Sequence, residues 1–385
     1  MTPAARIQAS IEILEQILSG TPVEKSLTNW ARRSRFAGSK DRAAVRDHVF
    51  EALRCKRSFA ALGGAETGRG LMIGAVRGSG EELADLFSGA RHAPAVLSQD
   101  ENGREFLTDA ERYDIPEWLW PRFQSSLGDQ TVAVARALQH RAPVHLRVNL
   151  IKTDVPDAIA ALAVEDIKAV AHPACETALE VAEGARKIAQ SRAYTEGLVE
   201  LQDAASQAVV AALELRPEMR VLDFCAGGGG KSLALAAHQG VKVIAHDVNA
   251  SRMRDLPARA ERAGVQVQIV STDELPQQDP FDVVLADAPC SGSGSWRRAP
   301  AGKWALTEDR LQELTGIQSC ILDQLKTLVA PGGVLAYATC SMLDDENGNI
   351  VDAFLRANPQ WSETFRKTWL VSHGADGFFT AHLTR

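Results

Sequence analysis

The spacing of apolar and polar residues changes twice along the chain and divides it into three parts. Up to about residue 140, apolar residues recur three or four positions apart, as in Ile7, Ile11 and Leu14, which predicts amphipathic helices. From Arg141, apolar and polar residues alternate through 144–150, which predicts a half-buried strand in a short α+β segment. After residue 200, short apolar runs alternate with helical patterns. We therefore predict domains at 1–140, 141–200 and 201–385.

The third part is predicted to be α/β, with a doubly wound, Rossmann-like parallel sheet. Its expected strands are 220–224, 242–247, 267–271, 282–286 and 333–339. Helical patterns lie between them at 232–238, 250–263 and 307–329. Such alternation places successive parallel strands in one sheet with helices on its faces.

The first part is predicted to be an all-helical domain with a basic surface. Thr2 and Pro3 are suited to begin a helix, and Gly20 to end it. Ser39 is expected to cap a later helix whose outer face carries Arg42 and Arg46. Residues 1–60 hold eleven Lys and Arg against six Asp and Glu, although the whole chain has a net charge of −7. This surface could follow the phosphates of a nucleic acid, or it could simply be solvated.

Composition excludes several classes of protein. No run of ~18 apolar residues is present, which argues against a membrane span. The first residues lack the pattern of a signal peptide. The six cysteines form no CxxC pair, which argues against a disulfide framework and against a zinc site. We expect a protein without metal in a reducing cytoplasm.

A glycine-rich loop follows the first predicted strand of the α/β part. Asp223 lies in that strand, and Asp247 ends the next one, 24 residues later. Glycines allow the backbone to approach a ligand closely, and an acid at the second strand end suits ribose hydroxyls. Asp273 follows the third strand, where it could contact adenine or form a turn. The candidate cofactor residues are Cys225, Ala226, Gly227, Gly228, Gly229, Gly230, Lys231, Asp247, Asp273 and Asp287.

The loop alone leaves the cofactor open, because NAD and S-adenosylmethionine fit it equally well. A phosphate loop of the GxxxxGK[ST] type is disfavoured, because Cys225 stands where the first glycine is required.

Two further cysteines each come at the end of a buried apolar run. Cys290 follows 281–285 and Cys340 follows 334–338, fifty positions later. Open α/β sheets bind ligands at the carboxyl ends of their strands, so both thiols are expected beside the glycine loop. A single such cysteine would be read as an inert core residue. The pair indicates nucleophilic chemistry.

Several motifs together resemble the RNA cytosine-C5 methyltransferases of the Nol/Nop/Sun family. They are Asp223 to Ser232, Asp287-Ala288-Pro289-Cys290-Ser291, Thr339-Cys340-Ser341 with Glu346-Asn347, Gln202-Asp203 with Ser206-Gln207, Arg147-Val148-Asn149, and Asp376-Gly377-Phe378-Phe379. The N-terminal 140 residues resemble the RNA-binding helical domain of the NusB antitermination factor. This pairing is similar to bacterial family members that modify small-subunit rRNA. One departure is Gly227-Gly228, where the family usually has Ala-Pro.

The resemblance implies a cofactor, a substrate and roles for four catalytic residues. The cofactor would be S-adenosylmethionine and the partner RNA, most simply rRNA. Cys340 would attack C6 of a cytosine, and Cys290 would assist breakdown of the adduct. Asp287 would hydrogen-bond the base, and Lys231 could favour the thiolate. In DNA cytosine methyltransferases the cysteine after the proline attacks, so Cys290 taken alone would be named the nucleophile.

One more expectation concerns RNA. After Cys290, cations and aromatic residues are interleaved at Trp296, Arg297, Arg298, Lys303 and Trp304. This pattern suits phosphate contact and base stacking, or else it anchors a surface loop.

Three alternatives to the leading function stay open at this point. They are the same chemistry on tRNA, a non-catalytic RNA-binding assembly factor, and a dehydrogenase.

Overall fold

The computed structural model describes all 385 residues and separates them into two compact units. One unit comprises Met1–Arg141 together with Trp296–Ala305, and the other comprises Ala142–Ser295 and Leu306–Arg385. The chain therefore crosses from one unit to the other three times. No helix combines the length and apolar character needed to cross a membrane, and all six cysteines are free.

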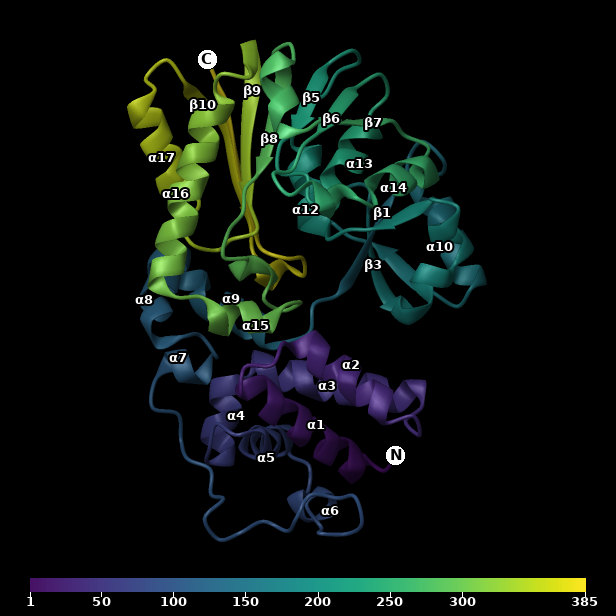
Figure 1. Cartoon of the computed structure of the whole chain (residues 1–385), viewed down its shortest axis with the longest axis vertical. Coiled ribbons are helices and arrows are strands. Elements are labelled where there is room, and N and C mark those ends of the chain that lie inside the picture. The colour runs from purple at the N-terminus through teal and green to yellow at the C-terminus, as the bar shows by residue number, and fades with distance from the viewer. The chain divides into compact units, whose positions relative to one another are not determined.

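The first unit is helical, as predicted (Figure 1). Its helices are α1 (Pro3–Leu18), α2 (Val23–Arg33), α3 (Ser39–Arg54), α4 (Lys56–Gly63), α5 (Gly68–Ser79), α6 (Leu83–Leu86), α7 (Asp109–Arg112), α8 (Trp120–Leu127), α9 (Thr131–Gln139) and α15 (Pro300–Ala305). Thr2 caps α1 as expected, and its side chain accepts the Ala5 N–H. Ser39 does not act as a cap, because α3 begins at that residue and the Asp41 carboxylate accepts the Gly38 N–H.

The segment after Cys290 packs in the helical unit, which corrects its expected role in stacking and phosphate contact. Trp296 is 2% exposed and stacks on Phe123, with 6.0 Å between ring centroids. The Lys303 ammonium donates to the Arg54 carbonyl (2.9 Å), and the Trp304 indole N–H donates to the Leu53 carbonyl (2.6 Å). These donors satisfy carbonyls that α3 leaves unpaired at its C-terminus. The two tryptophans and Lys303 therefore anchor this segment.

The second unit begins with a four-stranded antiparallel sheet in the order β2-β3-β1-β4. Its elements are β1 (Val144–Val148), α10 (Val155–Val164), β2 (Lys168–Ala171), β3 (Ala178–Glu183), α11 (Arg192–Thr195) and β4 (Val199–Leu201). β1 is not half-buried as predicted, since His145 and Arg147 on its polar face are also buried. Hydrogen bonds of these two side chains to Asp203 and Gln202 explain why the alternating pattern was misleading.

The rest of this unit is the predicted Rossmann-like sheet, with the strand order β10-β11-β9-β8-β5-β6-β7 (Figure 1). The strands are β5 (Arg220–Asp223), β6 (Lys242–Ala245), β7 (Val267–Ile269), β8 (Phe281–Asp287), β9 (Val329–Thr339), β10 (Ser362–Trp369) and β11 (Phe378–Thr384). The five predicted strands pair in parallel. β10 and β11, which the sequence analysis did not predict, extend the sheet antiparallel beyond β9.

Helices cover both faces of the seven-stranded sheet. They are α12 (Ala204–Ala211), α13 (Gly230–Ala236), α14 (Leu256–Ala263), α16 (Glu308–Leu325) and α17 (Gly348–Ala357). Successive strand residues point to opposite faces, so Leu222 packs in one core with Leu322 of α16, and Val221 in another with Val209 of α12. This construction brings the carboxyl ends of β5, β6, β8 and β9 to one edge.

Candidate active site

The glycine loop leaves β5 and enters α13 with a backbone that only glycine adopts easily. Gly227 and Gly229 have φ angles of 55° and 80°. A Cβ at Gly229 would lie 2.3 Å from Leu256 of α14. The absence of a side chain at Gly229 therefore allows the loop to pack closely against α14. A Cβ at Gly227 would meet the Arg252 guanidinium at 2.9 Å. An alanine at position 227, as in the family's usual loop, would require the Arg252 side chain to move.

Asp247 holds the glycine loop in place. Its Oδ2 accepts the Gly227 N–H at 2.8 Å and pairs with Arg252 at 3.1 Å, while Oδ1 accepts the Asn249 N–H at 2.9 Å. The Asp247 side chain is only 2% exposed. A ligand hydroxyl that reaches this carboxylate would replace the exposed Arg252 guanidinium as its hydrogen-bond partner.

The small antiparallel sheet also supports the loop, through the Arg147-Val148-Asn149 motif. Buried Arg147 donates to the Gln202 side chain and to the Gly230 carbonyl, the latter at 2.8 Å. Burial lowers the pKa of Arg147 to about 10. The Asn149 amide donates to the Ala263 carbonyl at the end of α14 (2.7 Å). The motif therefore fixes the loop and the helix that packs beside it.

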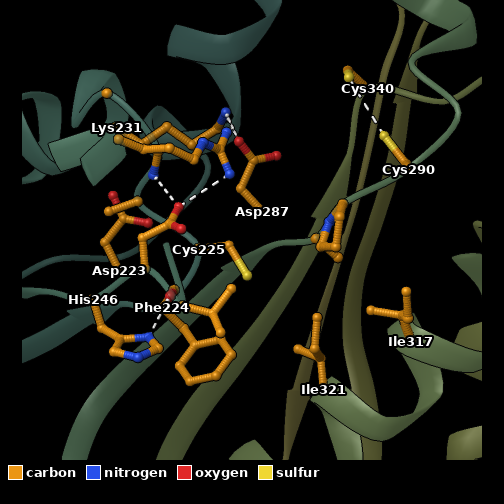
Figure 2. Close-up of a pocket in the computed structure, with 18 of the residues that line it drawn as sticks. Asp223, Phe224, Cys225, Lys231, His246, Asp287, Cys290, Ile317, Ile321 and Cys340 are labelled. Carbon is orange, nitrogen blue, oxygen red and sulfur yellow. Dashed lines mark hydrogen bonds and ion pairs between the residues drawn. The ribbon is translucent and has the colours of Figure 1, made fainter. Parts of the chain in front are cut away.

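A cavity of about 770 Å³ opens at this edge of the sheet and gathers most of the predicted site residues (Figure 2). Those that line it are Cys225, Ala226, Gly227, Gly228, Gly230, Lys231, Asp247, Asp287, Cys290 and Cys340. Gly229 and Asp273 are not among its lining residues. Asp273 is exposed in a 3₁₀ helix (Thr272–Gln277), and its neighbour Thr272 lines the cavity instead.

One end of the cavity is charged. Lys231 is buried, and its Nζ lies 2.7 Å from Asp287 Oδ2 and 4.7 Å from the centroid of the Phe378 ring. Burial opposes its charge, but Asp287 and Asp223 outweigh that effect and raise the pKa of Lys231. Burial raises the pKa of Asp223 to about 6. Asp223 Oδ2 accepts the Ser232 hydroxyl (2.6 Å), whereas its buried Oδ1 has no partner.

The other end carries the two thiols. The Sγ atoms of Cys290 and Cys340 lie 3.5 Å apart, because their strands β8 and β9 are parallel neighbours (Figure 2). A hydrogen bond with Cys340, together with burial, raises the pKa of Cys290 well above its ordinary value. Cys290 is therefore a thiol at neutral pH and can donate its proton toward Cys340. Burial also raises the pKa of Cys225, which keeps that thiol unreactive.

Glu346 fixes the chain after both cysteines. Its fully buried carboxylate accepts the Ser291 N–H (2.7 Å) and the hydroxyls of Ser291 and Ser341 (2.5 Å each). It also accepts the Gln318 amide at 3.1 Å. One carboxylate thus connects the residue after Cys290 with the residue after Cys340.

Glu346 and Arg147 were recognised in the sequence only as parts of motifs, with no role in the site. The loop partner Arg252 and the apolar wall formed by Ile317 and Ile321 of α16 were missed altogether. A glutamate fifty-five residues from the serine that it binds leaves no local signal. A strand arginine that alternates with apolar residues is indistinguishable in sequence from a surface residue.

Comparison with known proteins decides the family. Residues 210–384 match the model of the 16S rRNA methyltransferases RsmB/F, and residues 115–186 match a ferredoxin-like domain of RsmF/B-like methyltransferases. A ribosomal RNA small subunit methyltransferase B from Enterobacter sp. (strain 638) is 32% identical over 303 residues, which cover 74% of this chain and 70% of the relative. The chain belongs to the RsmB/F methyltransferase family.

Solved structures agree on the fold. A methyltransferase homologue from Pyrococcus horikoshii is 24% identical with a TM-score of 0.62, covering 71% of this chain and 96% of its own. NSun6 from Pyrococcus horikoshii, solved with SFG, is 18% identical with a TM-score of 0.63, covering 70% and 98%. The predicted family resemblance and fold class are therefore confirmed, and S-adenosylmethionine is the cofactor.

The cavity fits this cofactor. Asp223 lines the cavity and has an unpartnered Oδ1, and the cofactor would bring an ammonium and a sulfonium, both positively charged. The cavity volume lies in the range of cofactor pockets, about 300–1,000 Å³. Phe224 and Ile321 supply apolar lining beside these polar groups.

Proposed function

We propose that this chain methylates C5 of a cytosine in small-subunit rRNA, through a covalent adduct between Cys340 and C6. The observation that carries the proposal is the pair of thiols, 3.5 Å apart, at the same cavity as the glycine loop. Methylation of an amino group or a hydroxyl requires no thiol, whereas C5 of cytosine becomes nucleophilic only after addition to C6. The family and its named relatives support rRNA over tRNA as the substrate.

Cys340 is the nucleophile in this proposal, and Cys290 assists its departure. The Cys340 thiolate forms the Sγ–C6 bond, and the displaced electron pair is delocalised into the ring. The cofactor supplies an electrophilic methyl group. A base then accepts the C5 proton, the C5–C6 double bond re-forms, and the Sγ–C6 bond breaks with its electron pair returning to sulfur. Cys290 retains its proton and donates to Cys340, which favours the thiolate as leaving group.

The ion pair of Lys231 and Asp287 is proposed to position the base. Asp287 ends β8, three residues before Cys290, so its carboxylate lies on the same strand end as the thiols. Lys231 holds one carboxylate oxygen at 2.7 Å, which leaves the other for the exocyclic amino group and ring nitrogen of cytosine. Asp247 and the backbone of the glycine loop are proposed to hold the cofactor.

The helical unit is proposed to bind the RNA. Lys25, Arg32, Arg33 and Arg35 are exposed and form no ion pair, and Phe36 beside them is 76% exposed. Arg46 contributes less than predicted, because Glu24 pairs with it at 2.7 Å. Unpaired cations beside an exposed ring suit phosphates and an unstacked base. The domain division at 1–140, 141–200 and 201–385 is retained as part of this proposal.

The function is tested by methyl transfer to RNA from a strain that lacks this gene. The purified chain is incubated with S-adenosylmethionine and separated 16S rRNA, 23S rRNA or tRNA, and nucleosides are measured by mass spectrometry. We expect 5-methylcytidine in 16S rRNA alone, at one position by bisulfite sequencing. 5-Methylcytidine in tRNA would change the assigned substrate from rRNA to tRNA. A different methylated nucleoside would refute the cytosine-C5 chemistry.

The role of the helical unit is tested through the salt dependence of binding. Arg32→Gln, Arg33→Gln and Arg35→Gln together should weaken rRNA binding and flatten its salt slope by roughly two to three. Cofactor binding should be unchanged. Arg46→Gln is the matched control, because Glu24 already neutralises that arginine. An unchanged slope in the triple variant would make this surface a packing or partner face.

A further inference from the structure

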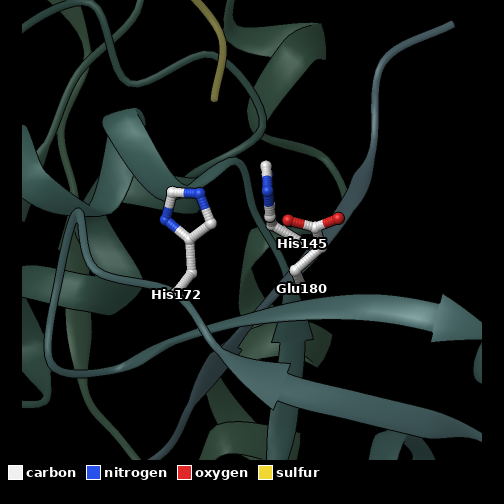
Figure 3. A group of neighbouring side chains, drawn as sticks. All are labelled: His145, His172 and Glu180. Atoms are coloured by element: carbon white, nitrogen blue, oxygen red, sulfur yellow. The ribbon is translucent and has the colours of Figure 1, made fainter. Parts of the chain in front are cut away.

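Three side chains with metal-binding atoms meet on one face of the small antiparallel sheet. His145 of β1 lies opposite Glu180 of β3, and His172 directly follows β2 (Figure 3). One ligand atom from each lies within 4.8 Å of the other two. His145 and His172 are buried, and their ring centroids are 4.9 Å apart. Sequence separations of 27 and 8 residues match no metal motif, which explains why the cluster escaped sequence analysis.

His145 is prepared as a ligand. Its Nδ1 lies 2.9 Å from Asp203 Oδ2, while its Nε2 is buried without a partner. Buried polar atoms are nearly always bonded, so an orphan nitrogen is a sign of a missing ligand. A carboxylate that accepts from one ring nitrogen fixes the tautomer in which the other nitrogen binds metal.

The two other side chains complete a set of ligands. The Glu180 carboxylate is partly buried and forms no hydrogen bond or ion pair. His172 is the second imidazole of the set, and it is buried. Its only hydrogen bond is a long one, in which Nδ1 accepts the Ala174 N–H at 3.2 Å. Coordination through Nδ1 would replace that contact.

We propose that His145, His172 and Glu180 bind a divalent transition metal ion, with zinc as the best match. Two imidazoles and a carboxylate are a common ligand set for zinc, with a fourth position open to water. Tetrahedral ligands stand about 3.3 Å apart around zinc, so the three side chains would close by small rotamer changes. The cysteine pattern predicted no zinc site, and this cluster contains no cysteine.

The metal would link the small antiparallel sheet to the start of α12 and the turn before β11, within the same unit. Asp203 caps α12 through the Ala205 N–H (2.9 Å) and accepts the Asp376 N–H (3.1 Å). A metal at His145 would therefore order Asp203, the start of α12 and the turn before β11. The ion would have a structural role, separate from methyl transfer.

The test is a titration with zinc chloride alone, on full-length protein stripped with a chelator. Cys290→Ser and Cys340→Ser are combined as the background, so that the thiol pair contributes no binding. We expect one ion per chain, with affinity reduced roughly tenfold or more by His172→Gln or Glu180→Gln. His382→Gln is the matched control, because His382 also has a buried, unpartnered Nε2 but belongs to no such cluster.

A second readout is the visible spectrum of the cobalt-substituted protein, which distinguishes tetrahedral nitrogen and oxygen ligands from thiolates. Circular dichroism confirms that each variant is folded; Glu180→Gln, on a partly exposed position, is expected to fold even if His172→Gln does not. Absence of stoichiometric binding would overturn the proposal. Equal affinity in Glu180→Gln, His382→Gln and the background would overturn it as well.

Discussion

The two ends of the cavity are built in opposite ways. Around the glycine loop, buried charges lie beside more exposed partners: Lys231 pairs with the partly exposed Asp287, and Asp247 pairs with the exposed Arg252. Buried Asp223 also acts on Lys231. Around the thiols, Cys290 and Cys340 contact each other, and the buried carboxylate of Glu346 has its hydrogen bonds satisfied.

This difference separates binding from reaction. Under the proposed function, the cationic cofactor would bind beside the buried, unpartnered Oδ1 of Asp223. A thiolate that must both attack and leave needs a hydrogen-bond donor more than a fixed countercharge, and Cys290 supplies one. Variants of Asp223 and Asp247 should change affinity and stability, whereas variants of Cys340, Cys290 and Glu346 should change the rate.

The largest effect is expected from Cys340→Ala. Loss of the nucleophile should reduce methyl transfer by roughly 10⁴-fold or more, while cofactor affinity is unchanged because the charged end is intact. Single-turnover transfer to 16S rRNA and calorimetric titration of the cofactor measure the two quantities. Residual transfer above about one per cent of wild type would show that Cys340 is not the nucleophile.

Asp223→Asn should stabilise the unliganded protein by as much as roughly 3 kcal/mol at pH 7.5. The folded protein keeps the Asp223 proton up to about pH 6, whereas the unfolded chain loses it near 3.8, so wild-type stability falls as pH rises between these values. Urea unfolding of both proteins between pH 4 and 8 measures the difference. If the stability difference between Asp223→Asn and wild type did not decrease below about pH 6, the burial of this charge would be contradicted.

Glu346→Gln should lower the rate by about 100-fold, the scale of a displaced catalytic group. The glutamine side-chain amide would place an N–H donor against the hydroxyls of Ser291 and Ser341, which now donate to Glu346. The segments after both cysteines would shift because these hydrogen bonds are lost. Cofactor affinity should not change. Glu363→Gln is the matched control, because Glu363 is a partly buried, ion-paired glutamate on β10 that does not line the cavity. If Glu346→Gln lost affinity and kept its rate, the two ends would not be separate.

Asp247→Ala should weaken cofactor binding by roughly 1–3 kcal/mol, the scale of hydrogen bonds to a charged group. The rate at saturating cofactor should stay within a few-fold of wild type. Asp247→Asn keeps one acceptor for the Gly227 N–H and should lose less. Calorimetry that finds equal affinity in wild type and Asp247→Ala would remove this carboxylate from the cofactor site.

The sequence predicted what short segments encode. Each strand of the parallel sheet is an apolar run, and each functional group at its end follows directly, so the cavity could be foreseen from Cys225, Asp247, Cys290 and Cys340. β10 was missed because it is mostly polar, and β11 was missed because its first residues were quoted only as part of a motif of the family resemblance. Trp296 and Lys303 were misread because composition does not distinguish a side chain that anchors a segment from one that binds RNA. Asp273 lay one residue from the lining position.

The roles of the two cysteines rest most directly on a trapping experiment. Wild type, Cys340→Ala and Cys290→Ala are each incubated with S-adenosylmethionine and 16S rRNA, then separated on a denaturing gel. We expect Cys290→Ala to accumulate a covalent protein–RNA adduct that mass spectrometry places at Cys340, and Cys340→Ala to form none. An adduct in Cys340→Ala, placed at Cys290, would reverse the assignment and contradict the account given for the thiol end of the cavity.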